Sequence, residues 1–350
     1  MKSFLAIRLT ALSAFLFAAT VSNRSVFSIF SRWDASWYAR IARRGYGTVI
    51  TTHDGRSLHD YAFFPLLPLL ERLLHDFTSL SYVTSGLCVS VIASLIAVVG
   101  IERIGKLYFP EYVKALVILW ALLPLSAVLW MSYSESLFTA LATWSLYFAL
   151  RERWFFTGLS ALLAGLTRPI GIALAFALLL HAVVDIRQRK RLHSLIAVLL
   201  APLGTLLYFC FVSSHSHAHS LFAYFRFQAG WGNGFDAGKS LFSFAFNGTL
   251  RGLLVLIAIA AILWLSYALV RAKLPFLLTS YALTIVAISL STAGYFSSKP
   301  RYLLPAFILL APIAQWAAKL TPKSQRWLTA LALIASVAAS AVFLLGSVAP

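Results

Sequence analysis

The chain has 350 residues, of which 60% are hydrophobic, 15% are aromatic and only 11% are charged. Soluble domains average about a quarter charged residues, so this composition excludes an ordinary soluble protein. The net charge of +18 invites comparison with nucleic-acid-binding proteins. Most Lys and Arg residues lie between apolar segments, however, where the positive-inside rule predicts them, and we therefore expect no nucleic-acid partner.

Apolar stretches of membrane-spanning length recur from one end of the chain to the other. Because about 20 apolar residues cross the hydrocarbon of a bilayer, they predict an all-α polytopic membrane protein with one membrane domain, residues 1–350. Two long loops, 23–80 and 214–249, are expected on the outer side. We predict about eleven spans by this criterion, at residues 4–22, 81–100, 113–131, 136–150, 154–167, 170–186, 194–213, 250–270, 274–294, 302–318 and 327–347.

The distribution of cations predicts the orientation. With the N-terminus in the cytosol, the inner connections hold most of the Lys and Arg residues, as the positive-inside rule requires. The short outer connections hold only Arg168, Lys299 and Arg301. Guanidinium and ammonium groups bind phosphate, so we interpret these three cations as candidates for holding the phosphate of a lipid substrate. Binding to ordinary phospholipid headgroups is the alternative.

Residues 31–47, SRWDASWYARIARRGYG, place an acid among aromatic and basic residues at the start of the first outer loop. A helix over 31–44 aligns Trp33, Trp37 and Ile41 at i, i+4 and i+8, a stripe suited to the membrane interface. Asp34 lies beside that stripe and is a candidate general base towards a lipid-borne substrate. The alternative is a plain interfacial helix in which Asp34 is a helix-start residue or a salt-bridge partner.

Residues 59–77, HDYAFFPLLPLLERLLHDF, contain an apolar stretch that is too short to cross the bilayer. Pro65 and Pro68 favour a helix start or a break there. This pattern predicts either a second interfacial helix in the first outer loop or a re-entrant segment. A simple lead-in to the next span is the alternative.

Residues 131–138, MSYSESLF, place Glu135 at the outer mouth between two spans. Ser132 or Ser134 would cap the following helix, while Glu135 would interact favourably with its N-terminal dipole. A contact between Glu135 and the substrate is the second interpretation, and the sequence supports both equally.

The second outer loop contains two polar motifs. SHSHAHS places His215, His217 and His219 at alternate positions, but a polar loop is favoured over a metal site because no acidic ligand lies nearby. We therefore assign no metal site and no cofactor, and leave a metal requirement open. FQAGWGNGFDAGKS, which contains Trp231 and Asp236, is either a flexible loop that closes over a sugar or a plain turn.

Taken in order, RWDASWYARIARRGYG, AFFPLLPLL, YSESLF, TRPIG and KPRYLLPAF resemble the PIG-V family of mannosyltransferases, over about residues 30–305. That family adds the second mannose of the GPI anchor in eukaryotes. The resemblance implies the GT-C glycosyltransferase fold and a dolichyl or polyprenyl phosphate mannose donor, used on the non-cytosolic face. The short loops favour a bacterial relative in the cytoplasmic membrane; a eukaryotic member would lie in the endoplasmic reticulum.

The resemblance and the residues together predict an inverting transfer to a lipid, glycan or protein acceptor. By motif, Asp34 matches the acid of the family's first outer loop and Glu135 the acid after its third span. Asp34 would act as general base, a role worth about 10²–10⁴-fold in rate, with Glu135 as the second candidate catalytic residue. The donor phosphate would contact Arg168, Lys299 and Arg301. The candidate substrate contacts are Trp33, Trp37, Tyr38, Trp231 and Tyr302.

Two alternatives stay open at this point. The same fold could use another lipid-linked sugar, such as arabinose or glucose. A lipid-linked sugar transporter also uses intramembrane cations and prolines, although transporters tend to show internal repeats, and this sequence shows none.

Overall fold

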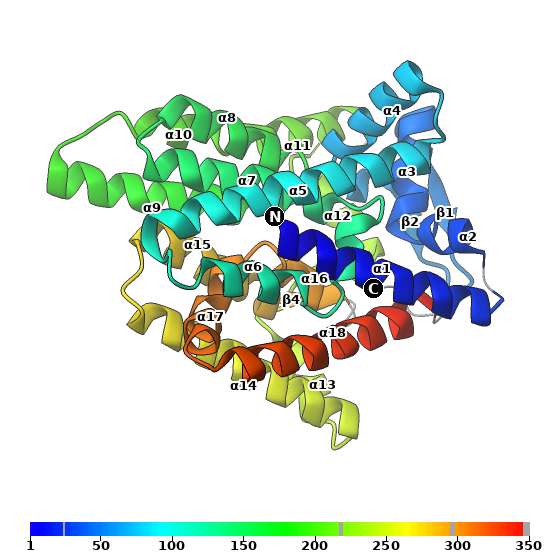
Figure 1. Ribbon diagram of the computed structural model, residues 1–350. Helices are drawn as coiled ribbons and strands as arrows, with labels where there is room; N and C mark the ends of the chain where they lie inside the picture. The colour runs from blue at the N-terminus through cyan, green and yellow to red at the C-terminus, as the bar shows by residue number, and fades with distance from the viewer. Residues whose placement is uncertain (24, 217–219, 295–297, 346–350) are drawn as a thin grey trace.

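The computed structural model describes residues 1–23, 25–216, 220–294 and 298–345. This part of the chain is built almost wholly from α-helices (Figure 1), which confirms the prediction of an all-α polytopic membrane protein. Six of its helical segments are long and apolar enough to cross a membrane: Lys2–Val21, Tyr82–Tyr108, Gly171–Arg189, Leu195–His215, Leu250–Arg271 and Pro322–Val342. Three shorter apolar helical segments accompany them: Trp154–Gly165, Phe276–Ser291 and Phe307–Ala318.

The first spanning helix is followed by a folded outer loop. In chain order the elements are α1 (Lys2–Val21), α2 (Val26–Phe30), α3 (Asp34–Arg44), β1 (Val49–Thr51), β2 (Ser57–His59), the 3₁₀-helix η1 (Asp60–Ala62) and α4 (Leu66–Thr78). The strands β1 and β2 form an antiparallel hairpin that the all-helical prediction missed. The fully buried Asp60 fixes the base of this hairpin, because its carboxylate accepts hydrogen bonds from the N–H groups of Gly47 (3.1 Å) and Thr48 (2.8 Å).

Both segments of this loop that we expected to be helical form helices, with different starts from those predicted. The helix expected over 31–44 begins at Asp34, because Trp33 adopts φ 53° and ψ −125°, which is not helical. In α4, Pro65 is the N-cap and Pro68 lies in the first turn. Proline has no N–H, but at these two positions of α4 this costs no hydrogen bond, because the first four N–H groups of a helix have no partner within it.

The central part of the chain forms most of the membrane bundle. Its elements are α5 (Tyr82–Tyr108), α6 (Val113–Ala121), the 3₁₀-helix η2 (Ser126–Trp130), α7 (Ser134–Leu150), α8 (Trp154–Gly165), α9 (Gly171–Arg189), α10 (Leu195–Leu200) and α11 (Leu203–His215). Successive long helices pack on one another, α5 against α7, α7 against α8 and α8 against α10 (Figure 1).

The C-terminal part adds the second outer loop and the remaining spans. Its elements are α12 (Ala223–Gly230), β3 (Gly234–Phe235), α13 (Lys239–Ala245), α14 (Leu250–Arg271), α15 (Phe276–Ser291), β4 (Thr292–Ala293), α16 (Lys299–Leu303), the 3₁₀-helix η4 (Phe307–Leu310), α17 (Ala311–Ala318) and α18 (Pro322–Leu345). Pairing of β3 with β4 ties the second outer loop to the end of α15.

Three of the predicted spans are not continuous helices. The divided segments are 113–131, 194–213 and 302–318. The divisions fall at Pro124, Pro202 and Pro305. Proline lacks an N–H and clashes with the carbonyl one turn earlier, so it ends or bends a helix even in an apolar stretch. Hydropathy locates these segments correctly but does not predict their breaks.

The arrangement places the outer loop over one end of a single packed body. One hydrophobic core contains buried residues from Phe4 to Ala314, and α1 and α18, from the two ends of the chain, lie against each other. The elements α2, α3, α4, β1 and β2 gather at one end of the helix bundle, on the right of Figure 1. Residues 23–80, which we predict to be the first outer loop, therefore cover that end of the bundle.

Candidate active site

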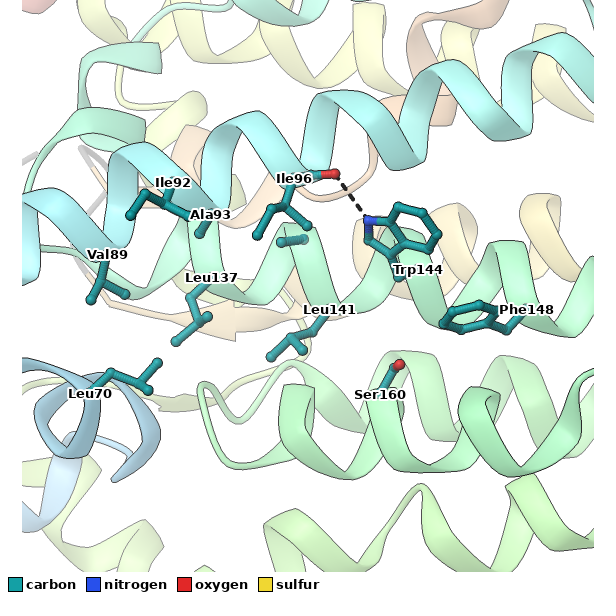
Figure 2. Close-up of a pocket in the computed structure, with 11 residues that line it drawn as sticks. Leu70, Val89, Ile92, Ala93, Ile96, Leu137, Leu141, Trp144, Phe148 and Ser160 are labelled. Carbon is teal, nitrogen blue, oxygen red and sulfur yellow. Dashed lines mark hydrogen bonds between the residues drawn. The ribbon is translucent and has the colours of Figure 1, made fainter. Parts of the chain in front are cut away.

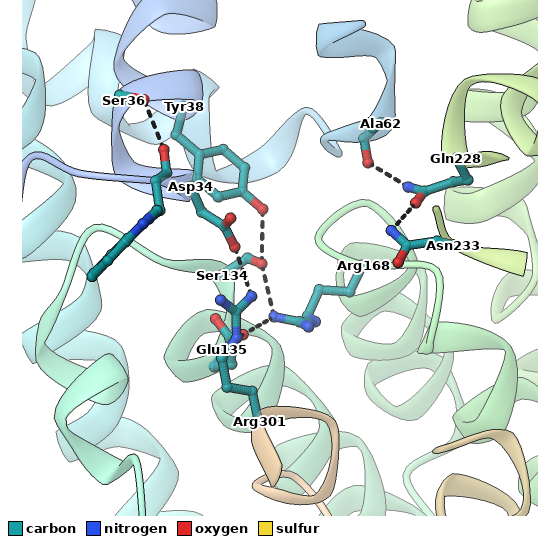
Figure 3. A network of polar contacts seen from close by, with 11 residues as sticks. Asp34, Ser36, Tyr38, Ala62, Ser134, Glu135, Arg168, Gln228, Asn233 and Arg301 are labelled. Carbon is teal, nitrogen blue, oxygen red and sulfur yellow. Dashed lines mark hydrogen bonds and ion pairs between the residues drawn. The ribbon is translucent and has the colours of Figure 1, made fainter. Parts of the chain in front are cut away.

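Four charged side chains from four distant segments meet where the first outer loop covers the bundle. Asp34 begins α3, Glu135 lies in the first turn of α7, Arg168 precedes α9 and Arg301 lies on α16. Arg301 donates through Nη2 to Asp34 Oδ2 (2.6 Å) and through Nε to Glu135 Oε1 (2.8 Å), as Figure 3 shows. Arg168 Nη1 lies 2.5 Å from the same Glu135 oxygen. We call these four residues the charge cluster.

The two arginines of the charge cluster are buried, and their guanidinium groups face two carboxylates. Arg168 and Arg301 are only 8% and 6% exposed. Burial alone would lower the pKa of Arg301, but the neighbouring Asp34 and Glu135 raise it well above its ordinary value. An unpaired buried charge is strongly destabilising, so this mutual neutralisation explains how the bundle accommodates two arginines.

The two carboxylates of the charge cluster differ in accessibility. The side chain of Asp34 is 25% exposed, whereas that of Glu135 is 1% exposed. Glu135 Oε1 accepts from both arginines, and among the described residues its buried Oε2 has no hydrogen-bond partner. A substrate can therefore reach Asp34 more easily, while Glu135 is placed to hold the two guanidinium groups. This geometry favours a structural role for Glu135 over a direct contact with the substrate.

Ser134 connects the charge cluster to α3. Its Oγ accepts hydrogen bonds from Tyr38 Oη (2.9 Å) and Arg168 Nη1 (3.3 Å). Burial raises the pKa of the Tyr38 phenol, which therefore stays protonated and acts as a donor. The expected N-cap role of Ser132 or Ser134 is wrong: the N-cap of α7 is Tyr133, without a side-chain cap bond. Both serines bind other side chains instead.

The aromatic residues predicted to touch substrate mostly position α3. The Trp37 ring stacks on Phe63 with centroids 5.7 Å apart and meets Trp231 edge-on at 5.1 Å. The Trp231 indole N–H donates to the carbonyl of His59 (3.1 Å). Trp37 and Tyr38 are buried, and Trp231 is half-buried. These contacts link α3, the hairpin and the second outer loop, so they fix the helix that carries Asp34.

Trp33 and Tyr302 remain half-buried beside the charged groups. The Trp33 ring lies 4.3 Å from the Arg32 guanidinium carbon, and the Tyr302 ring lies 5.6 Å from that of Arg168. A further ring that sequence reasoning missed, Tyr133, lies 4.8 Å from the guanidinium carbon of Arg301. Cation–π contacts of this kind favour a charged guanidinium at a desolvated site.

Lys299 makes different contacts from those predicted for a phosphate-binding residue. Its ammonium donates to the main-chain carbonyls of Ser289 (3.1 Å) and Thr292 at the end of α15. These contacts neutralise the carbonyl end of a helix, a favourable place for a cation. The structure therefore brings Arg168 and Arg301 together and leaves Lys299 in a separate, helix-terminating role.

Asp236 also has a local role. Its two carboxylate oxygens accept hydrogen bonds from the N–H groups of Gly238 and Ser240, both at 2.9 Å, just before and within the first turn of α13. The Gly-rich motif therefore runs from the end of α12 through the short strand β3 to the start of α13, and it is not a plain turn. Of the three histidines considered for a metal, His217 and His219 lie outside the described residues. Within the described ranges, no three His, Cys, Asp or Glu side chains gather to hold a metal ion.

A buried acid outside the charge cluster supports the start of α7. Glu71 on α4 is fully buried, and its Oε1 accepts a hydrogen bond from the Ser132 hydroxyl. Gly86 on α5 packs so closely against this pair that a Cβ there would overlap both side chains. Burial raises the pKa of Glu71 to about 8, so its carboxyl is protonated at neutral pH. No feature of the sequence distinguishes this Glu from the other acids of the first outer loop.

Replacing Glu71 by Gln should stabilise the protein near pH 8 and have little effect near pH 4.5. The folded protein keeps the Glu71 proton up to about pH 8, whereas the unfolded chain releases it near the ordinary value of 4.5. The stability that this group contributes is complete below pH 4.5 and is lost as the pH rises towards 8, by about 1.4 kcal/mol per pH unit. Glutamine does not titrate, so Glu71→Gln removes that loss.

Thermal unfolding at the two pH values measures the effect, with Asp76→Asn, at an exposed position of α4, as the matched control. The interpretation of Glu71 as a neutral buried acid is wrong if Glu71→Gln shifts the unfolding temperature equally at both pH values.

An apolar groove with a volume of about 600 Å³ opens on another side of α7 (Figure 2). It lies between α4, α5, α7 and α8, and the Trp144 indole N–H is held on its wall by the carbonyl of Ile96 (3.1 Å). Leu137 and Trp144, which line it, are two and nine residues beyond Glu135, so they point about 180–200° away from that carboxylate. The groove is therefore not part of the charge cluster.

Comparisons with known proteins support the fold. No protein-family profile and no curated protein sequence matches the chain. ArnT from Cupriavidus metallidurans bound to undecaprenyl phosphate is similar in structure, with a TM-score of 0.61 and 16% identity over 95% of this chain and 63% of that one. The apo state of the same protein gives a TM-score of 0.57 and 16% identity, over 93% and 64%. The chain has the GT-C fold.

The GT-C fold is the one that the PIG-V resemblance implies, so that expectation is confirmed. The chain spans less than two thirds of the length of ArnT. In this GT-C chain, the charge cluster lies under the first outer loop, and four residues predicted from sequence, Asp34, Glu135, Arg168 and Arg301, make it up.

Proposed function

We propose that the protein is a membrane glycosyltransferase that moves a sugar from a polyprenyl phosphate-linked donor to an acceptor hydroxyl. The observation that carries the proposal is the contact between a partly exposed carboxylate, Asp34, and a buried guanidinium, Arg301. This reaction needs a base for the acceptor and cations for the departing phosphate, and the charge cluster supplies both. The GT-C fold and the undecaprenyl phosphate bound to ArnT support a lipid phosphate as the leaving group.

The charge cluster also suggests how donor binding prepares the base. Without substrate, the Arg301 Nη2 group is engaged by Asp34 at 2.6 Å. A donor phosphate would compete with Asp34 for this guanidinium, because guanidinium groups bind phosphate oxygens in pairs. Arg301 would then turn to the phosphate, and Asp34 would be released to accept a proton. Glu135, held away from solvent, would keep Arg168 and Arg301 in place throughout.

The chemical step is a single displacement at the anomeric carbon. The acceptor oxygen bonds to that carbon while the bond from the carbon to the phosphate oxygen breaks. The acceptor's hydroxyl proton passes to Asp34, and Arg168 and Arg301 stabilise the charge on the leaving polyprenyl phosphate. One displacement inverts the configuration, so a β-linked donor gives an α-linked product.

The PIG-V motifs support mannose as the donor sugar and a lipid, glycan or protein as the acceptor. The positive-inside distribution supports a site on the non-cytosolic face, and the short loops favour a bacterial cytoplasmic membrane. Trp33 and Tyr302, which remain half-buried near the charged groups, are the aromatic residues best placed to contact the sugar. Trp37, Tyr38 and Trp231 would act indirectly, through the position of α3.

A transfer assay with purified protein in proteoliposomes tests this function. The donors are radiolabelled polyprenyl phosphate mannose, glucose and arabinose, and the acceptors are the lipids and glycans extracted from a deletion strain of the source organism. We expect label to pass from the mannose donor to one acceptor, with free polyprenyl phosphate formed in equal amount. Asp34→Asn protein is the negative control.

The other outcomes identify the alternatives. Transfer from glucose or arabinose instead of mannose keeps the enzyme class and corrects the sugar. Movement of an intact lipid-linked sugar across the vesicle membrane, without transfer, would make the protein a transporter and contradict the proposal.

A further inference from the structure

A second buried cation lies in the membrane outside the charge cluster. Arg8 on α1 is 4% exposed, and its guanidinium packs against η2. Its Nη1 donates to Ser126 Oγ (2.7 Å), and its guanidinium carbon lies 5.3 Å from the Trp130 ring. Its Nε is buried and has no hydrogen-bond partner among the described residues.

No Asp or Glu carboxylate of the described residues neutralises Arg8. The sequence has 11 Asp and Glu residues, all within the described ranges, and none of the ion pairs in those ranges includes Arg8. This differs from the charge cluster, where each arginine contacts a carboxylate. A charged side chain in the membrane is costly without a partner, so Arg8 needs a counter-charge from another source.

A small cavity next to Arg8 has room for that counter-charge. Its volume is about 20 Å³, and Arg8, Trp130 and Ser340 line it together with apolar side chains. This volume accommodates about one water-sized group and excludes a phospholipid headgroup. The other two serines nearby are engaged elsewhere, since Ser126 donates to the carbonyl of Ala121 (3.0 Å) and Ser336 to that of Leu123 (3.2 Å). The Arg8 Nε–H is a buried donor without a partner among the described residues, and Ser340 lines the same cavity.

We propose that this cavity binds a single halide ion, chloride in the cell, with Arg8 as its cationic partner and Ser340 as a second donor. A water molecule would satisfy the Nε–H but would leave the charge of the guanidinium uncompensated. A monovalent anion accepts the hydrogen bond of the Nε–H and also compensates the charge of the guanidinium. The cavity is lined by α1, η2 and α18, so the anion joins the first and the last helices of the chain.

Thermal unfolding of the full-length protein in detergent tests the site, in sodium chloride, sodium bromide and sodium gluconate at equal ionic strength. Gluconate is too large for the cavity. Because a ligand that binds the folded state stabilises it, we expect chloride and bromide to raise the unfolding temperature by about 3 °C over gluconate. Arg8→Met should abolish that difference, whereas Arg326→Met, at an exposed position of α18, should keep it.

A second measurement covers the case in which Arg8→Met does not fold. Ser340→Ala should reduce the difference between bromide and gluconate, and crystals grown in bromide should show anomalous density beside Arg8. Equal unfolding temperatures in all three salts, or a halide effect that persists in Arg8→Met, would overturn the proposal. Absence of anomalous density at Arg8 would do the same, and would assign the cavity to water.

Discussion

Replacing Asp34 by Asn should lower the rate of sugar transfer by about 10²–10⁴-fold, the usual contribution of a general base. The amide has the size of the carboxylate, and its oxygen can still accept a hydrogen bond from Arg301. It cannot take the acceptor's proton. The fold should persist, because Glu135 continues to hold both arginines. Initial rates of transfer from polyprenyl phosphate mannose in proteoliposomes measure the effect.

The matched control for this change is Asp54→Asn, which alters an exposed carboxylate of the same outer loop. Its rate should equal that of the wild type. Retention of activity within about threefold by Asp34→Asn would be inconsistent with a general base and would leave Asp34 as a salt-bridge partner.

Replacing Glu135 by Gln should destabilise the protein by about 3–5 kcal/mol, the usual effect of removing one partner from a buried ion pair. Glu135 Oε1 contacts both Arg168 and Arg301, so its loss leaves two buried guanidinium groups with one carboxylate between them. Transfer activity should also fall, because Arg168 and Arg301 would no longer be held in position. Thermal unfolding and initial rates, measured on the same preparation, report the two effects separately.

The double variant Glu135→Gln/Arg168→Met provides the internal control for this interpretation. Removing one unpaired arginine should restore part of the lost stability, because residues in one ion-pair network are not additive. Glu111→Gln, in a connection between two spans, should have no effect. A Glu135→Gln protein as stable as the wild type would show that Glu135 does not hold the arginines in the folded state.

The members of the charge cluster could be selected from sequence, but their contacts could not. Acids are scarce in an apolar chain and the positive-inside rule makes outer cations exceptional, so Asp34, Glu135, Arg168 and Arg301 stood out. Asp34 and Arg301 are separated by 267 positions, and hydropathy gives no information about which spans pack together. Their pairing therefore required the structure.

Lys299 shows the limit of the same argument. Its place in an outer connection stays a prediction, and the side of the membrane does not determine which group an ammonium contacts. Carbonyl groups at the end of α15 lie within its reach and bind it instead. The prediction that Ser132 or Ser134 caps α7 is wrong for a similar reason. Capping propensity is a local preference, whereas the partners of these serines, Tyr38, Arg168 and Glu71, are distant in sequence.

The sequence predicts the fold class and the positions of the apolar segments, but it does not predict the breaks at prolines or the hairpin β1–β2. Long apolar stretches identify the helices because a helix satisfies every backbone hydrogen bond within its own segment, as the bilayer requires. The hairpin β1–β2 was missed because its strands are three residues long and have no alternating pattern. Its position depends on the buried carboxylate of Asp60, which binds two backbone N–H groups. A lone Asp in a loop gives no sequence signal for such a role.

The most direct test of the proposed site is the affinity of the protein for polyprenyl phosphate, measured at equilibrium in wild-type and Asp34→Asn proteins. If phosphate and Asp34 compete for Arg301, the Asn variant should bind polyprenyl phosphate as tightly as the wild type or more tightly, while it fails to transfer sugar. Weaker binding by Asp34→Asn, together with unchanged transfer by any protein that remains bound, would contradict both the competition and the role of Asp34 as the base.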